Sequence, residues 1–275
     1  MKASTIGFIG GGNMARSLIG GLIADHTDPA ALWVSEPDPQ QRERLHEGSV
    51  HVIDDNDALV RHADVVVLAV KPQVLGQICQ TIAPVVRVRN PLIVSIAAGI
   101  RLADMERWLG GKPAIVRTMP NTPALVQCGA TALVANARVN AAQKELAEGI
   151  MRAVGLTLWL EREEQMDAVT ALSGSGPAYF FLVMEALESA AAELGLAKDT
   201  ARLLTLQTAF GAAKMALESP DDAATLRQRV TSPGGTTEQA LRVLDEGDLR
   251  RLFRRALQAA SDRSEELARL LGGQG

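Results

Sequence analysis

Two glycine-rich segments of the sequence contain residue types suited to binding anions. The first, Gly10-Gly11-Gly12-Asn13-Met14-Ala15, follows the apolar run Ile6–Ile9 and fits the pattern G-x-G-x-x-A. In this pattern the first glycine permits a tight turn, the second lets the backbone approach a pyrophosphate, and a small sixth residue lets helix and strand pack closely. Unpaired N–H groups at the start of the next helix attract phosphate. The segment therefore predicts a dinucleotide site.

The second segment is Thr231-Ser232-Pro233-Gly234-Gly235-Thr236-Thr237-Glu238-Gln239. Pro-Gly-Gly predicts a tight turn, and Thr-Thr-Glu-Gln predicts the start of a helix. Backbone N–H groups together with two hydroxyls at a helix start would suit a carboxylate. The same residues would also be explained if threonine only capped the helix. Local chemistry leaves both interpretations open.

Three more turns each follow a predicted strand: Ala69-Val70-Lys71-Pro72, Ser95-Ile96-Ala97-Ala98-Gly99 and Met119-Pro120-Asn121-Thr122-Pro123. The carboxyl ends of the strands in an open α/β sheet are where such sheets bind ligands. The small residues Ala97, Ala98 and Gly99 would leave room for a flat nicotinamide ring. Each turn alone has ordinary turn composition. Three on one edge of one sheet favour a ligand site.

The choice between NAD and NADP as the bound dinucleotide depends on the segment Ser35-Glu36-Pro37-Asp38, which follows the apolar residues of a predicted strand. An acid at this point usually binds the ribose hydroxyls of the adenosine and favours NAD. Ser35 and Arg42 are alternatives that would receive a 2′-phosphate instead. The sequence leaves NADH and NADPH both open.

These segments must be positioned by a regular framework, and the first 160 or so residues provide one. Short β-branched runs alternate there with helical patterns, which indicates a doubly wound α/β domain with a largely parallel sheet. The predicted strands are Ile6–Ile9, Leu32–Ser35, Val50–Ile53, Val65–Val70, Leu92–Ile96 and Ala114–Met119, with Ala130–Val134 and Thr157–Leu160 as extensions.

After about Glu164 the β-branched runs end, and Ala, Leu and Glu dominate. Helices are predicted over Ala178–Leu194, from about Asp199 to Glu218, and from about Asp248 to Leu271. We therefore expect two domains, a dinucleotide-binding domain over 1–163 and an all-helical domain over 164–275. Helices with broad Ala/Leu faces pack closely against other helices, so a homodimer through this second domain is expected.

Composition limits the partners and the compartment. The chain has 275 residues with 47% hydrophobic and 22% charged residues, a net charge of -4 and a pI of about 5.7. No basic surplus points to nucleic acid or an anionic membrane, and no apolar run is long enough for a membrane span. Cys79 and Cys128 suit neither a disulfide framework nor a metal site, and both are expected to be buried. We expect a cytoplasmic protein without a metal.

With these motifs assembled, the sequence resembles the pyrroline-5-carboxylate reductase family over essentially its whole length. The resemblance rests on five segments: Ile9–Ala15, Ala69–Pro72, Met119–Pro123, Ser173-Gly174-Ser175-Gly176-Pro177-Ala178-Tyr179 and Val230–Thr237. It implies a Rossmann domain followed by a helical dimerisation domain, with dimers often assembled into a larger ring such as a decamer. It implies NADPH or NADH as donor and reduction of 1-pyrroline-5-carboxylate to proline.

The resemblance also implies roles for individual residues. It assigns cofactor contacts to Gly10, Gly11, Gly12, Asn13, Met14, Ser35, Asn56, Ala69, Val70, Lys71, Pro72, Ala97, Ala98 and Gly99. It assigns the substrate to Ser232, Gly234, Gly235, Thr236 and Thr237, with Thr237 as the catalytic residue near the imine nitrogen. Many members have a Glu shortly before this loop, where this chain has Ser219-Pro220-Asp221-Asp222. The acid that faces the site is therefore left open.

Two other functions compete with this prediction. A 3-hydroxyacid dehydrogenase of similar plan would need a general base, usually His or Lys. All four histidines lie before residue 63, and Lys214 lacks the surrounding residues of such enzymes. An imine needs less, because its nitrogen can be protonated before hydride arrives. A nucleotide-sensing regulator without turnover is the second alternative, but it would leave the Ser232–Thr237 loop without a purpose.

Overall fold

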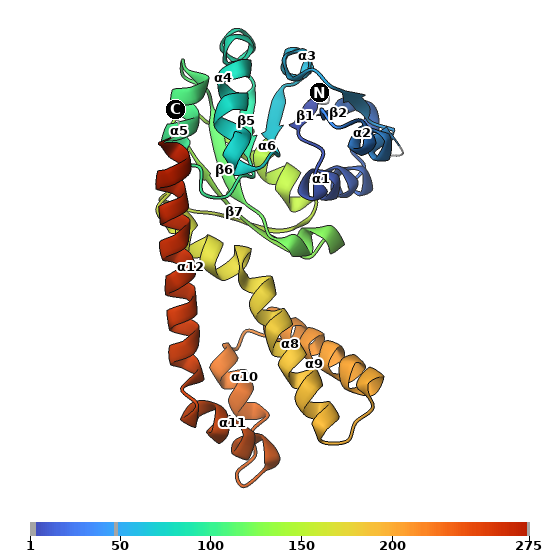
Figure 1. Ribbon diagram of the computed structural model, residues 1–275, viewed down its shortest axis with the longest axis vertical. Helices are drawn as coiled ribbons and strands as arrows, with labels where there is room; N and C mark the ends of the chain where they lie inside the picture. The colour runs from blue at the N-terminus through green and yellow to red at the C-terminus, as the bar shows by residue number, and fades with distance from the viewer. Residues whose placement is uncertain (1–3, 47–48, 274–275) are drawn as a thin grey trace. The chain divides into compact units, whose positions relative to one another are not determined.

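The computed structural model describes residues 4–46 and 49–273. These residues form two compact units (Figure 1). The first contains the described residues up to Ser175 together with those from Ala259 on, and the second is Gly176–Gln258. The predicted division into 1–163 and 164–275 concerns the roles of the two parts and stays a prediction.

The first unit is built on one eight-stranded sheet with the order β3-β2-β1-β4-β5-β6-β7-β8. The first six strands are parallel, β7 is antiparallel to β6, and β8 is parallel to β7. The expected α/β fold is thus confirmed, and both short extensions belong to the sheet. The strands are β1 Ile6–Ile9, β2 Leu32–Ser35, β3 His51–Ile53, β4 Val65–Leu68, β5 Leu92–Ser95, β6 Ile115–Met119, β7 Gly129–Ala135 and β8 Gly155–Trp159.

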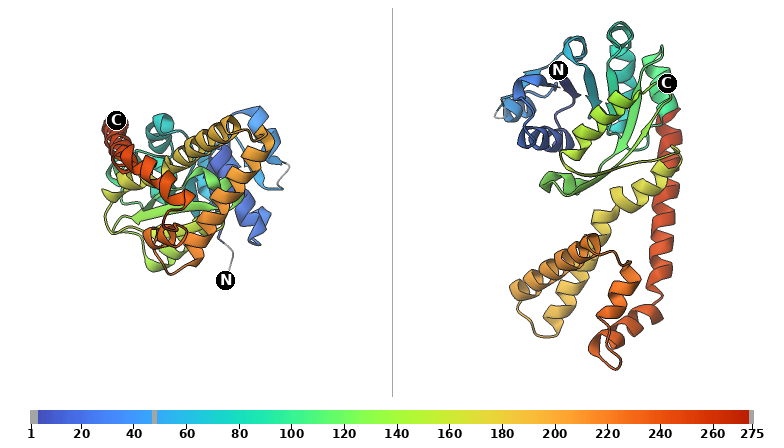
Figure 2. Two further views of the ribbon diagram at one scale, coloured as in Figure 1. Left: turned by 90° about the horizontal axis from the view of Figure 1, so that it is seen from below. Right: turned by 180° about the vertical axis from the view of Figure 1, so that it is seen from behind.

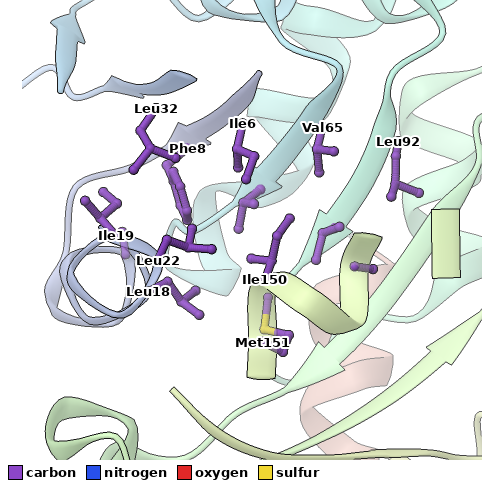
Figure 3. Packing of buried hydrophobic residues seen from close by; sticks show 14 of the residues in the cluster. Ile6, Phe8, Leu18, Ile19, Leu22, Leu32, Val65, Leu92, Ile150 and Met151 are labelled. Atoms are coloured by element: carbon purple, nitrogen blue, oxygen red, sulfur yellow. The ribbon is translucent and has the colours of Figure 1, made fainter. Parts of the chain in front are cut away.

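Helices cover both faces of this sheet, which explains why the central strands are apolar throughout. One face packs against α1 (Asn13–Ala24), α2 (Pro39–His46) and α6 (Ala141–Arg152). Figure 3 shows side chains of α1 and α6 meeting those of β1, β2, β4 and β5 in this core. The other face packs against α3 (Asn56–His62), α4 (Pro72–Arg89) and α5 (Leu102–Leu109). The core lies in these two layers.

The cysteines differ from one another. Cys79 of α4 is buried, as expected, and burial raises the pKa of its thiol to about 12. The prediction that Cys128 is buried is wrong, because it is exposed. Cys128 lies in the short connection between the 3-10 helix η2 (Thr122–Val126) and β7, just after Gln127, whose φ is 57°. Cys128 N–H donates to the carbonyl oxygen of Pro123 at 3.1 Å, so Cys128 belongs to this turn and not to the largely buried strand β7.

The last helix, α12 (Leu249–Gly272), ends against α5 of the first unit, as two views show (Figures 1 and 2). Arg107 of α5 donates to the carbonyl oxygen of Gly272 at 2.5 Å. Ser264 donates to the buried carboxylate of Asp167 in α7 (Gln165–Val169) at 2.6 Å. A Cβ at Gly272 would collide with the carboxylate of Asp104. Residues far apart in sequence thus close the first unit.

Between α7 and α8 the helix widens into a π-helical turn, η3 (Thr170–Gly174), in which Ser175 N–H donates to Thr170 at 2.9 Å. Neither α7 nor this turn was predicted from the amino-acid pattern. π-turns are rare and frequently mark functional sites. This turn lies at the end of the first of the two segments that form the first unit, which stops at Ser175.

The second unit is helical, as predicted. It contains α8 (Gly176–Glu193), which ends before Gly195 at φ 96°, and α9 (Lys198–Glu218). Two shorter helices, α10 (Ala223–Arg229) and α11 (Thr236–Glu246), precede α12. Large apolar side chains of this unit are exposed: Phe180, Phe181, Leu182, Val183, Leu187, Leu203, Leu204, Phe210 and Leu217. No helix among the described residues is long and apolar enough to span a membrane.

Candidate functional site

The glycine turn between β1 and α1 has the geometry that a pyrophosphate requires. Gly10 has φ 97°, and a Cβ there would lie 2.6 Å from the carbonyl oxygen of Ala69, so only glycine fits. At Gly12 the space is open, since a Cβ would meet no described heavy atom within 4 Å. Gly12 is also the N-cap of α1, and it offers no side chain to cover the helix N–H groups. The turn therefore fits a dinucleotide phosphate.

Glu36 extends beneath this turn from the end of β2. Its Oε2 accepts from Gly11 N–H at 2.8 Å and its Oε1 accepts from Asp38 N–H at 3.0 Å. The side chain is only 7% exposed. Next to it, Ser35 is buried, and its Oγ has no hydrogen-bond partner among the described residues. Arg42 donates through Nη1 to the carbonyl oxygens of Glu36 and Pro37, each at 2.9 Å.

The other predicted cofactor residues lie at the same edge of the sheet. Ala69 and Val70 follow β4, and Lys71 is the exposed N-cap of α4, with Pro72 at its first position. Ala97, Ala98 and Gly99 follow β5, where Gly99 has φ 72°. Asn56 begins α3, just after β3 and the cap Asp55. Because β1 to β5 are parallel, their carboxyl ends bring all these residues to one edge.

The turn after β6 belongs to this edge too, and Asn121 ties it to two other elements. Asn121 Oδ1 accepts from Ala130 N–H of β7 at 2.9 Å. Its Nδ2 donates to the carbonyl oxygen and to Oγ of Ser173, at 3.2 and 3.1 Å. A Cβ at Gly174 would lie 2.5 Å from the methyl group of Met119. The Met119–Pro123 turn and the π-turn are therefore packed as one piece.

The Ser232–Thr237 loop lies in the other unit, and its structure weakens the capping explanation. Helix α11 begins at Thr236, and its N-cap is Gly235, which has no side chain. Thr236 and Thr237 occupy the first two helical positions rather than the cap. Gly234 has φ 72°, which only glycine adopts readily. Its N–H donates to Oε2 of Glu238 at 2.8 Å.

The acids before this loop all have partners in the second unit. Glu218 pairs with Lys214, and Asp221 pairs with Arg229. Asp222 caps α10 by accepting from Thr225 N–H at 2.8 Å. That backbone N–H holds the pKa of the Asp222 carboxyl below its usual value. These contacts give Asp221 and Asp222 local structural roles.

Three contacts of the site were not foreseen in the sequence. Glu36 was considered only as a ribose ligand, but it also holds Gly11 N–H. Asn121 was seen only as part of a turn, although it links β7 to Ser173. Glu238 reaches back to Gly234, and the signal for it was available, since an acid at the third helical position commonly accepts from backbone N–H groups near the cap. The described residues include no group of His, Cys, Asp and Glu that would hold a metal ion.

Comparison with known proteins gives the family. The pattern described as "Pyrroline-5-carboxylate reductase dimerisation" matches residues 163–267. The pattern described as "NADP oxidoreductase coenzyme F420-dependent" matches residues 5–99. A pyrroline-5-carboxylate reductase of Pseudomonas aeruginosa is 53% identical over 273 residues, which are 99% of this chain and 100% of the relative. The chain belongs to the pyrroline-5-carboxylate reductase family.

Solved structures of pyrroline-5-carboxylate reductases share the fold. The structure from Coxiella burnetii has a TM-score of 0.92 at 51% identity, covering 96% of this chain and 98% of that one. The structure from Plasmodium falciparum, with NADP bound, has a TM-score of 0.87 at 30% identity, covering 98% and 99%. Family membership confirms the predicted enzyme class, an NAD(P)H-dependent oxidoreductase, and favours it over the hydroxyacid dehydrogenase and the regulator.

Proposed function

We propose that this chain reduces 1-pyrroline-5-carboxylate to L-proline at two sets of residues, one in each unit. The single observation that carries the proposal is the open turn at Gly12, on the uncapped start of α1, in a member of this reductase family. It provides the room and the N–H groups that a dinucleotide phosphate needs. The two parts would act as domains over 1–163 and 164–275, and the dimerisation pattern begins at residue 163, next to this boundary.

In the proposed cofactor site, residues of the sheet edge hold NADH or NADPH. Gly10, Gly11, Gly12, Asn13 and Met14 receive the pyrophosphate; Ser35 and Asn56 lie at the adenosine end; and Ala69, Val70, Lys71, Pro72, Ala97, Ala98 and Gly99 line the nicotinamide end. When bound, the nicotinamide supplies hydride to the imine carbon. The support is the shared edge, because ligands bind at the carboxyl ends of strands in such sheets.

In the proposed substrate site, the Ser232–Thr237 loop binds the carboxylate of the cyclic imine. Gly234 and Gly235 have no side chains, so backbone N–H groups of the loop can approach the carboxylate. Ser232 and Thr236 add hydroxyl groups. Thr237, in the first turn of α11, orients the ring nitrogen as it changes from iminium to amine. The substrate can arrive protonated, so a protein base is not required. Rate enhancement would come mainly from orienting two bound reactants and excluding water.

Substitution of Thr237 by valine tests this assignment. Losing one hydrogen bond to a charged group costs about 1.5–3 kcal/mol, so kcat/KM should fall roughly 10- to 200-fold. Thr237 lies past the cap, so the melting temperature should change little, and cofactor affinity should be unaltered. Thr200→Val, in the first turn of α9, makes the same chemical change as a control. A large loss of stability with unaltered kinetics would defeat the catalytic role.

The assembly and compartment are further parts of the proposal. A dimer through the helical unit is supported by its exposed apolar side chains and by the dimerisation pattern over 163–267. Assembly of these dimers into a decamer rests on family resemblance, and a cytoplasmic location rests on the composition and cysteine content of the sequence. Mass measurement by light scattering on the purified chain tests both the dimer and the larger ring.

A further inference from the structure

Glu36 is fixed by the protein in a position that faces the adenosine end of the proposed cofactor site. It follows β2, and the order β3-β2-β1-β4 places it on the side of the β1/β4 reversal where the adenosine half binds. Gly11 N–H and Asp38 N–H each hold one oxygen of its carboxylate. Its orientation is therefore set before any cofactor binds.

A carboxylate in this position treats the two donors differently. It accepts hydrogen bonds only, so it suits the two ribose hydroxyls of NADH. The 2′-phosphate of NADPH replaces one of these donors, and a phosphate monoester carries about −1.5 to −2 charge at pH 7. With Glu36 only 7% exposed, water screens the repulsion poorly.

The neighbouring groups offer the 2′-phosphate little compensation. Ser35 is only 1% exposed, so its hydroxyl offers a phosphate much less accessible surface than a side chain on the exposed turn would. Arg42 donates to two backbone carbonyl oxygens of the same turn. The turns after β2 and β3 add three further acids, Asp38, Asp54 and Asp55, and the first turn of α3 adds Asp57. Arg42 is the single base that the described contacts bring to these turns.

We propose that Glu36 makes NADH the preferred hydride donor of this chain. The inference rests on the proposed cofactor site. The Plasmodium falciparum relative, 30% identical, was solved with NADP bound, so the shared fold accepts a 2′-phosphate. The preference of this chain is therefore assigned to its own residues at the end of β2.

The unmodified chain provides the first test, with a readout that does not depend on turnover. Dissociation constants for NADH and NADPH are measured by calorimetry, together with those for the half-cofactors 5′-AMP and 2′,5′-ADP. We expect NADH to bind at least tenfold more tightly than NADPH, which corresponds to about 1.4 kcal/mol. The half-cofactors should rank in the same order. Equal or tighter binding of NADPH would overturn the inference while leaving the cofactor site intact, whereas binding of neither dinucleotide would overturn the site itself.

Variants then test whether Glu36 is responsible. Glu36→Gln removes the charge and keeps an oxygen that can accept a backbone N–H, and Glu36→Ser removes the acid altogether. Both variants should reduce the preference for NADH, measured as the ratio of the NADPH to the NADH dissociation constant, at least fivefold. Most of this change should come from tighter binding of NADPH. Glu43→Gln, on the exposed face of α2, removes one negative charge nearby and should leave the ratio unchanged. If Glu43→Gln changes this ratio of dissociation constants as much as Glu36→Gln does, Glu36 has no specific role in the preference.

Discussion

Two glycines in the turn after β1 are required for opposite reasons. At Gly10 the backbone has φ 97° and the carbonyl oxygen of Ala69 leaves no room, whereas at Gly12 the conformation is ordinary and the space is open. Gly10→Ala should therefore destabilise the fold, by about 1–3 kcal/mol of unfolding free energy. Gly12→Val should fold with a loss under about 1 kcal/mol, as expected for an N-cap change, yet lose dinucleotide binding.

Urea denaturation and a binding titration on the same two variants separate these effects. If Gly12→Val binds NADH or NADPH as tightly as the parent, the pyrophosphate does not lie at this turn. If Gly10→Ala is as stable as the parent, the carbonyl oxygen of Ala69 does not exclude a Cβ at residue 10.

At the scale of single residues, the sequence predicts those roles that depend only on the conformation of the local backbone. The Gly10–Ala15 turn and the glycines of the Ser232–Thr237 loop were recognisable because glycine spacing reports a conformation directly. The contacts of Glu36, Asn121 and Glu238 were not, because each depends on where another segment lies. A side chain on a surface turn has several backbone groups in reach, and the sequence does not say which one it contacts.

At the scale of elements, Asn121 joins three segments of the first unit through both ends of its amide. Asn121→Ala would leave Ala130 N–H and the Ser173 carbonyl oxygen without this partner in a part-buried place. A cost of about 2–4 kcal/mol in unfolding free energy is expected. Asn121→Asp keeps the acceptor for Ala130 but loses the donors, so it should recover only part of that stability.

Urea unfolding monitored by circular dichroism measures both variants. Asn90→Ala would not serve as a control, because Asn90 has φ 49°; Gln127 is unsuitable for the same reason. Gln77→Ala, on an outer position of α4, is the appropriate amide deletion and should cost under about 0.5 kcal/mol. Equal stability of Asn121→Ala and the parent would show that the π-turn is held by other contacts.

The strands were predicted closely because burial on both faces produces continuous apolar runs, and their ends coincide with Gly, Pro and Asn turns. The antiparallel direction of β7 was not predicted, because the apolar pattern of a strand does not indicate its direction in the sheet. The π-turn was missed for a related reason. The segment Thr170–Gly174 has no pattern of its own and is shaped by Asn121 and Met119, which lie some 50 residues earlier.

At the scale of the molecule, the second unit exposes apolar helix surfaces that the proposed dimer would cover. Phe180 and Phe181 of α8 are each more than 60% exposed, as is Phe210 of α9. Fully burying one such side chain contributes about 1.5–3 kcal/mol, so several of them provide a strong drive for association. Phe181→Arg should weaken the dimer and lower the specific activity at low protein concentration, while the first unit still binds the cofactor.

Light scattering and activity across a dilution series test this expectation. Val88→Arg is the matched control, because Val88 is an exposed apolar residue of α4 in the first unit. It should leave the mass and the activity unchanged. A parent chain that is active as a monomer at low concentration would show that the helical unit does not need a partner.

The closing of the first unit by α12 has a consequence for how the chain is made on the ribosome. Residues up to Ser175 are synthesised before the segment from Ala259 that packs on α5 and α7. About 80 residues of the second unit lie between them, and at typical rates of synthesis they take roughly 4–16 s to produce. During that interval Asp167 and the end of α5 lack their partners on α12. The first unit therefore stays incomplete, and accessible to chaperones and proteases, until α12 has been synthesised.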